Sequence, residues 1–197
     1  MKLDVYQVDA FTNELFKGNP AMVVSLNDWI SDDLMQNIAA ENNLSETAFY
    51  VRNGEGFEIR WFTPTLEVDL CGHATLAAAF VIFKRGEVAD NQVVFNSRSG
   101  ALKVDKTPDG LELDFPASVP VAAEVPVWIK DVGGNPVEAY SCEDDFLLIY
   151  DSEEAIRNLT PDFTALKRVP VRGIICSSTS NRYDFVSRFF APGAGID

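Results

Sequence analysis

The sequence predicts an α+β fold made of two similar halves, each a curled sheet around a central helix. Strand-like segments outnumber helical ones and are often joined by tight-turn residues. The segment 73–84 is apolar nearly all round, as is typical of a helix enclosed by a sheet. The pattern Arg-x-Phe-x-Pro occurs at residues 60–64 and again at 188–192, each followed at the same interval by aspartate. This repetition indicates an internal duplication.

Extended and helical segments alternate through the first half. Ser31 can cap a helix over residues 32–41, which carries two aspartates in its first turn. Asn53-Gly54 suits a tight turn between two strands, and Gly86 can end the apolar helix. Strands are expected at residues 2–10, 21–26, 46–51, 57–63, 92–97, 101–106 and 111–115.

A moderate enrichment in proline over residues 116–136 marks the best candidate boundary, which divides the chain into domains 1–116 and 117–197. In the second domain, helices are expected after Ser152 and at Thr160-Pro161, with Thr160 as cap and Pro161 in the first helical position. The chain stops at Asp197, where the first copy of the repeat goes on to a Cys-Gly-His loop. The second half is therefore expected to be incomplete. Strands are expected at residues 146–150, 171–177 and 184–190.

Composition excludes several classes of function. The net charge of −14, from 30 acidic and 16 basic residues, argues against nucleic acid and anionic membranes as partners. No apolar run reaches the roughly 20 residues that span a bilayer, and the N-terminus lacks the apolar core of a signal peptide. Three cysteines without paired spacing predict a reducing, cytoplasmic location. With one histidine and no Cys-x-x-Cys, no zinc site is expected.

The loop Cys71-Gly72-His73 carries the strongest functional indication, because it opens the apolar helix and holds the only histidine of the chain. Free N–H groups at a helix start attract an anionic group. His73 could carry a proton or donate to a substrate, or it could simply pack at the helix start. Cys71 could be a thiolate base, but a small buried apolar residue is the favoured interpretation.

Glu46 lies in Ser45-Glu46-Thr47, between polar residues and a segment that should be buried. A carboxylate held at a buried strand start would have a raised pKa and could take and return a proton. From this segment alone, a solvated glutamate in a helix–strand loop remains the commoner alternative.

Several segments together resemble the PhzF (phenazine-biosynthesis-like) family. The match is close over about the first hundred residues and extends through the segment 189–196. The segments that carry it are Gln7-Val8-Asp9-Ala10-Phe11-Thr12, Gly18-Asn19-Pro20-Ala21, Ser45-Glu46-Thr47-Ala48-Phe49, Arg60-Trp61-Phe62-Thr63-Pro64 and Asp69-Leu70-Cys71-Gly72-His73-Ala74-Thr75.

The resemblance implies a diaminopimelate-epimerase-like fold with two pseudo-symmetric halves, each a mostly antiparallel sheet, and an active site in the cleft between them. It also implies cofactor-free proton-shift chemistry. Glu46 inherits the role of proton carrier, and His73 acts beside it in catalysis. Gly72 and His73 inherit substrate contact, and Ser45 lines the same pocket. Related epimerases have a cysteine just before the glycine that corresponds to Gly72, so Cys71 stays a minor candidate for the base.

The function predicted is therefore that of a PhzF-like isomerase or epimerase that shifts a proton on a small carboxylated metabolite, with Glu46 as general acid/base. The partner expected is that small anionic metabolite, and a homodimer is the assembly considered. Two alternatives stay open: a non-catalytic ligand-binding or interaction protein that retains half of the cleft, and an epimerase whose base is Cys71.

Overall fold

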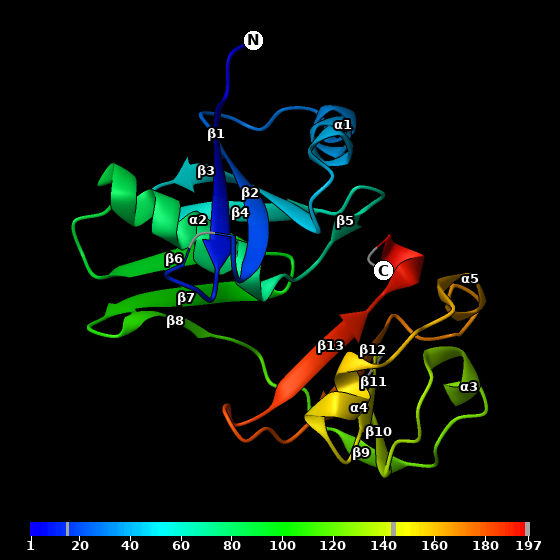
Figure 1. Ribbon diagram of the computed structural model, residues 1–197. Helices are drawn as coiled ribbons and strands as arrows, with labels where there is room; N and C mark the ends of the chain where they lie inside the picture. The colour runs from blue at the N-terminus through cyan, green and yellow to red at the C-terminus, as the bar shows by residue number, and fades with distance from the viewer. Residues whose placement is uncertain (15, 143–144, 196–197) are drawn as a thin grey trace. The chain divides into compact units, whose positions relative to one another are not determined.

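The computed structural model describes residues 1–14, 16–142 and 145–195 (Figure 1). The chain forms two compact units, Met1–Pro116 and Ala117–Asp197. No helix within the described part of the chain is both long and apolar enough to cross a membrane.

The first unit is a mixed, mostly antiparallel sheet of eight strands. Its strands follow the order β1-β2-β3-β4-β6-β7-β8, and the short β5 pairs with β4. Two neighbouring pairs, β2 with β3 and β4 with β6, are parallel. The bounds are β1 Asp4–Ala10, β2 Asn19–Leu26, β3 Glu46–Asn53, β4 Gly56–Phe62, β5 Glu67–Val68, β6 Gln92–Ser97, β7 Gly100–Thr107 and β8 Gly110–Asp114.

Helix α2 (Gly72–Arg85) is the central element of this unit, as the sequence predicts. Its buried alanines allow the helix axis to approach the sheet closely. The helix contacts β2 and β3, and it also contacts β1 and β8, which lie at the two ends of the strand order (Figure 1). The sheet therefore curls around it. Gly86 ends the helix in the left-handed conformation, with φ of 67°.

A second helix, α1 (Asp32–Asn42), covers the opposite face of β3. Ser31 precedes it in an extended conformation, but the Ser31 side chain makes no capping hydrogen bond. Since strand side chains alternate between faces, Ala48 and Tyr50 of β3 pack in the α2 core, whereas Phe49 and Val51 pack in the α1 core. By the same alternation, Glu46 points to the α2 side.

The second unit holds a five-stranded sheet in the order β13-β12-β11-β10-β9. Over its described residues, short helices accompany this sheet and no long central helix is present. Ser152 caps α4 as predicted, accepting from the Ala155 N–H. The bounds are β9 Val121–Ala123, α3 Ile129–Val132, β10 Glu138–Cys142, β11 Asp145–Ile149, α4 Glu153–Arg157, α5 Phe163–Leu166, β12 Gly173–Ser178, β13 Val186–Phe190 and the 3₁₀ turn η1 Pro192–Ala194.

One predicted helix start in this unit is wrong. Helix α5 begins after Asp162, whose carboxylate accepts from the Ala165 N–H, and not after Thr160. Aspartate competes well for a cap position because its charge also suits the positive helix start. Pro161 consequently lies outside the helix.

The strand topology repeats between the units. Strands β1 to β4 pair antiparallel, parallel and antiparallel in turn, and β10 to β13 do the same. The repeated sequence frame falls on β4 and β13, where Phe62 lies opposite Thr47 and Phe190 opposite Ile174. The duplication inferred from sequence is therefore visible in the strand pairing. Ile196 and Asp197, which close the second copy, lie outside the described residues.

Candidate active site

Glu46 is the first residue of β3 and is buried, with 7% of its surface exposed. Burial raises the pKa of its carboxyl group to about 7, because the ionised form loses its water, and a hydrogen bond from the Cys71 thiol opposes that rise. The carboxyl group therefore changes charge near neutral pH, where an ordinary glutamate is already ionised.

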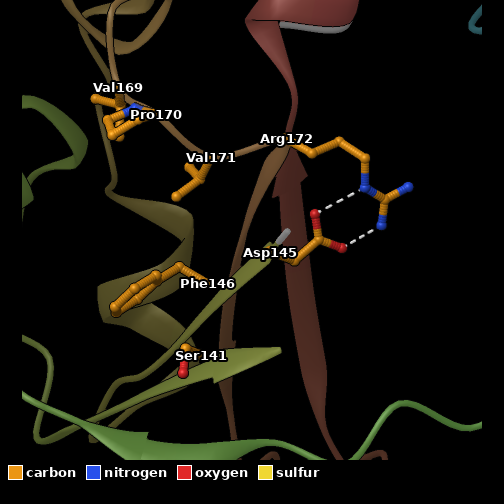
Figure 2. A pocket seen from close by; sticks show the side chains of 7 residues that line it. All are labelled: Ser141, Asp145, Phe146, Val169, Pro170, Val171 and Arg172. Atoms are coloured by element: carbon orange, nitrogen blue, oxygen red, sulfur yellow. Dashed lines mark hydrogen bonds and ion pairs between the residues drawn. The ribbon is translucent and has the colours of Figure 1, made fainter. Parts of the chain in front are cut away.

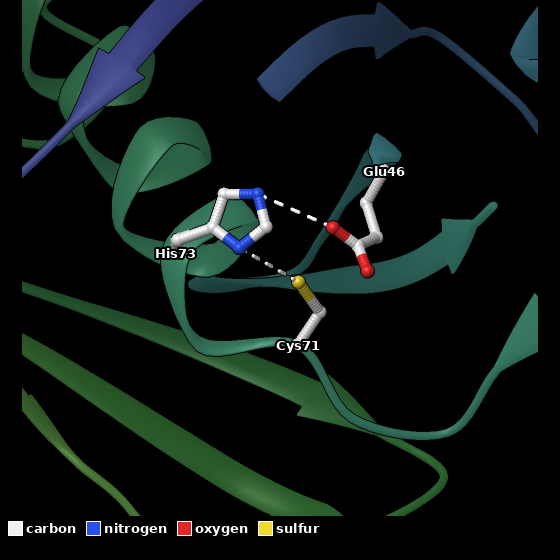
Figure 3. A group of neighbouring side chains, drawn as sticks. All are labelled: Glu46, Cys71 and His73. Carbon is white, nitrogen blue, oxygen red and sulfur yellow. Dashed lines mark hydrogen bonds and ion pairs between the residues drawn. The ribbon is translucent and has the colours of Figure 1, made fainter. Parts of the chain in front are cut away.

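His73 and Cys71 approach Glu46 from the start of α2 (Figure 3). The distance between His73 Nε2 and Glu46 Oε2 is 3.3 Å, and the distance between Cys71 Sγ and His73 Nδ1 is 3.5 Å. His73 is also buried, at 9% exposed. Side chains from two segments, predicted separately from sequence, thus meet at one point inside the first unit.

Burial sets the protonation of the other two groups as well. It lowers the pKa of His73, although the Pro20 backbone carbonyl opposes this, so the imidazole is neutral at neutral pH. It holds the pKa of the Cys71 thiol well above its usual range, and the Glu46 carboxylate nearby adds to that effect. A neutral imidazole carries its proton on one ring nitrogen only, and the tautomer with the proton on Nε2 directs it toward Glu46.

Two buried atoms at this point, Glu46 Oε2 and His73 Nε2, make no hydrogen bond to any described residue. Their 3.3 Å approach meets the distance of an ion pair but not the geometry of a hydrogen bond. Buried polar atoms are usually satisfied, so such a pair is typical of a functional site that a ligand completes.

The remaining predicted residues lie beside this cluster. Ser45 immediately precedes Glu46 and is half-buried, and Gly72 is the first residue of α2. The side chain of Cys71 makes no capping hydrogen bond at the helix start. The first main-chain bond of the helix runs from the Thr75 N–H to the Cys71 carbonyl, so the preceding amides of the first turn have no main-chain acceptor within the helix, and those of His73 and Ala74 face the Cys71 sulfur.

Sequence reasoning missed two neighbours of His73. One is Pro20, whose carbonyl reaches the imidazole. The other is Phe11, whose ring centroid lies 6.5 Å from that of His73. Phe11 is 72% exposed and has φ of 67°, an uncommon conformation for a bulky residue. It also lines a cavity of about 840 Å³ between the end of β1 and α2, together with Leu76 and Phe80.

A second cavity, of about 530 Å³, lies within the second unit and contains none of the predicted site residues (Figure 2). Its charged members, Asp145 and Arg172, form an ion pair with each other, with Arg172 Nε 3.0 Å from Asp145 Oδ1. Because these charges satisfy each other, this cavity shows none of the unpaired polar atoms found beside Glu46.

The repeat does not duplicate the buried glutamate. Glu46 pairs with Ala21 of the neighbouring parallel strand, and the corresponding pair in the second unit is Gly173 with Asp145. A Cβ atom at Gly173 would come within 2.3 Å of the Phe189 ring. The counterpart of Glu46 therefore has no side chain, and the Phe189 ring occupies the space that one would take.

Comparison with known proteins identifies the family. A family model described as "phenazine biosynthesis-like protein" (PhzC-PhzF) matches residues 8–197. The chain belongs to the PhzF family. It is 50% identical to an uncharacterized isomerase of Pseudomonas aeruginosa, over 100% of this chain and 76% of that protein. It is 36% identical to the human phenazine biosynthesis-like domain-containing protein, over 100% of this chain and 78% of that protein.

Solved structures agree with this PhzF assignment. A PhzF family protein of Enterococcus faecalis superposes with a TM-score of 0.90 at 45% identity, over 100% of this chain and 76% of that one. A hydroxyproline epimerase of Agrobacterium vitis, 10% identical over 96% of this chain and 70% of its own, shares the fold with a TM-score of 0.57. The PhzF fold assignment and the α+β prediction are confirmed, and family membership together with the names of the relatives supports an isomerase or epimerase.

Proposed function

We propose that this PhzF protein catalyses a cofactor-free proton shift on a small carboxylated metabolite, with Glu46 as the general acid/base. The observation that carries the proposal is the buried Glu46 carboxyl group, with a pKa of about 7, facing His73 Nε2 at 3.3 Å. A general base works best when its pKa lies near the working pH, because it is then ionised often enough and still basic enough.

The start of α2 supplies the complementary part of the proposal. Amides of the first turn, including that of Gly72, can hold the substrate carboxylate, and the helix dipole favours negative charge there. His73 Nε2–H can donate to an oxygen on which charge develops as the proton leaves carbon. Removing a proton beside a carboxylate is difficult in water, so such prepared donors would lower the barrier.

A mechanism with one proton-carrying side chain suits this site better than a mechanism with two. The repeat places Gly173 at the counterpart of Glu46, so this pair of strand positions offers one carboxylate. One carrier that takes a proton from one atom and returns it to another performs an isomerisation. The raised pKa of Cys71 disfavours a thiolate as the base.

Gly72 allows a test of substrate contact without disturbing the fold. A Cβ atom there would meet only the Phe115 ring and Leu113, at 3.6–3.9 Å, which is ordinary contact. The fold therefore gives no reason for glycine at this position, whereas close approach of a substrate does. We expect Gly72→Ala to change the free energy of unfolding by less than about 1 kcal/mol and to raise KM about tenfold or more. An unchanged KM would remove Gly72 from the binding site.

The proposal is tested by incubating the chain in D₂O with a panel of small carboxylic acids that carry an acidic C–H. Mass spectrometry and proton NMR would show deuterium entering the substrate at carbon. We expect at least one member to acquire label in an enzyme-dependent manner. Saturable binding of such acids with no label in any of them would instead support the alternative of a ligand-binding protein.

A further inference from the structure

We propose that Glu46, Cys71 and His73 together form an inhibitory binding site for a thiophilic divalent cation, of which Zn²⁺ is the type. Each residue offers one ligand atom, and the three atoms lie within 4.8 Å of one another. The ion would occupy the proton-transfer position as an inhibitor and not as a resident cofactor. The inhibition rests on the function proposed above, whereas the binding does not.

The donor set points to the class of ion. A thiol sulfur, an imidazole nitrogen and a carboxylate oxygen are the three ligand types that Zn²⁺ uses in proteins, and a sulfur ligand selects against Mg²⁺ and Ca²⁺. Zinc often takes three protein ligands and leaves its fourth position to water or another small ligand.

The unsatisfied atoms provide a second and independent indication. Glu46 Oε2 and His73 Nε2 are both buried, face each other and lack a hydrogen-bond partner among the described residues. A cation bound by both atoms would satisfy them together.

Two of the three ligand atoms already lie at the separation that one tetrahedral ion requires. Metal–ligand bonds of about 2.0–2.3 Å place neighbouring ligand atoms about 3.3–3.8 Å apart. The Oε2–Nε2 distance already lies in that range. Cys71 Sγ faces the other ring nitrogen, 3.5 Å from Nδ1, so the sulfur must move toward Nε2 before all three ligands bind one ion. The thiol proton would pass to the solvent as the metal–sulfur bond forms, and the imidazole, still neutral, would carry its ring proton on Nδ1 while Nε2 binds the ion.

Inhibition follows from the identity of the occupied atoms. An ion bound to the Glu46 carboxylate takes up the lone pair that would accept the substrate proton, and an ion at Nε2 replaces the proton that would be donated. Loss of activity at a zinc concentration that also saturates binding is therefore expected.

The experiment titrates the purified chain with Co²⁺ alone, as a spectroscopic substitute for Zn²⁺, and then displaces it with Zn²⁺. We expect one ion per chain, with the intense near-ultraviolet absorption of a cobalt–sulfur bond. Cys71→Ser, His73→Asn and Glu46→Gln should each weaken binding by more than about 100-fold, which exceeds the cost of losing an outer partner of a metal site. Cys142→Ala, which changes a thiol in the second unit, is the matched control and should bind normally.

The proposal is overturned if no cobalt–sulfur absorption appears, if Cys71→Ser and His73→Asn bind as the parent does, or if Cys142→Ala abolishes binding. Circular dichroism of each variant shows whether it is folded. If Cys71→Ser or His73→Asn does not fold, the binding measured for Glu46→Gln still tests the site. Binding that follows this pattern in a protein that exchanges no label into any substrate would refute the proposed function and leave the cation site standing.

Discussion

Glu46→Gln is expected to lose proton-transfer activity by about 10²- to 10⁴-fold, the range that a positioned general acid/base contributes. Glutamine keeps the size of the side chain at the start of β3 but cannot accept and return a proton at neutral pH. Substrate binding should persist, because in this account the charged group of the substrate is held by the start of α2. The measurement is the rate of deuterium incorporation by the variant and the parent on any acid that the parent labels.

Two control variants make this result specific. Glu41→Gln makes the same change at an exposed position of α1 and should leave the rate unchanged. Cys71→Ala should retain most of the activity, because burial keeps that thiol protonated. Equal rates for Glu46→Gln and the parent would exclude Glu46 as the carrier, and loss of activity only in Cys71→Ala would favour a thiol-based epimerase.

The same Glu46→Gln variant should be more stable than the parent at high pH. The folded-state pKa of Glu46, about 7, is above its value of 4.5 in an unfolded chain, so the folded protein binds the proton more tightly. Stability is therefore lost as pH rises from about 4.5 to about 7, and above that the buried charge costs about 3 kcal/mol. Glutamine carries no charge and avoids this cost.

Urea unfolding of both proteins across this pH range measures the effect. The difference in the free energy of unfolding between Glu46→Gln and the parent should be constant below about pH 4.5, increase through the interval and level off above about pH 7. A difference independent of pH would mean that Glu46 has the same pKa in the folded and unfolded states.

The sequence predicted much of the first unit for identifiable physical reasons. The alternation of apolar residues located the strands to within a few residues, and the apolar surface of residues 73–84 predicted a central helix. Glu46 and His73 were named because each lies where a polar group meets a buried segment. Their mutual approach depends on β3 lying beside the start of α2, which the resemblance to the PhzF family implied and local patterns could not.

Other features could not be read from local patterns. Nothing in a single strand start shows that the Pro20 carbonyl will face an imidazole from a distant helix. Phe11 follows β1 with a positive φ and lies exposed beside His73, an arrangement that no local sequence pattern predicts. The three-residue β9 is too short to show an alternating pattern, and β10 carries only small or polar residues beside Tyr140.

Glu46, Cys71 and His73 were each named from sequence as site candidates, but their grouping as metal ligands was not predicted. Sulfur and nitrogen ligands come from one loop, but the oxygen ligand comes from a strand 25 residues earlier than Cys71, and no fixed spacing describes such a set. Spacing rules detect sites built on one loop or helix, whereas this cluster forms only when the sheet closes on α2.

NMR provides the most direct test that Glu46 is a buried carboxyl group that exchanges its proton near neutral pH. Carbon-13 label in the glutamate side-chain carboxyl groups would be followed from about pH 4 to about pH 9, a range that brackets ordinary and raised carboxyl pKa values. One resonance is expected to titrate with a midpoint of about 7 and to be missing from Glu46→Gln. Titration of every glutamate carboxyl group below about pH 5 would contradict it.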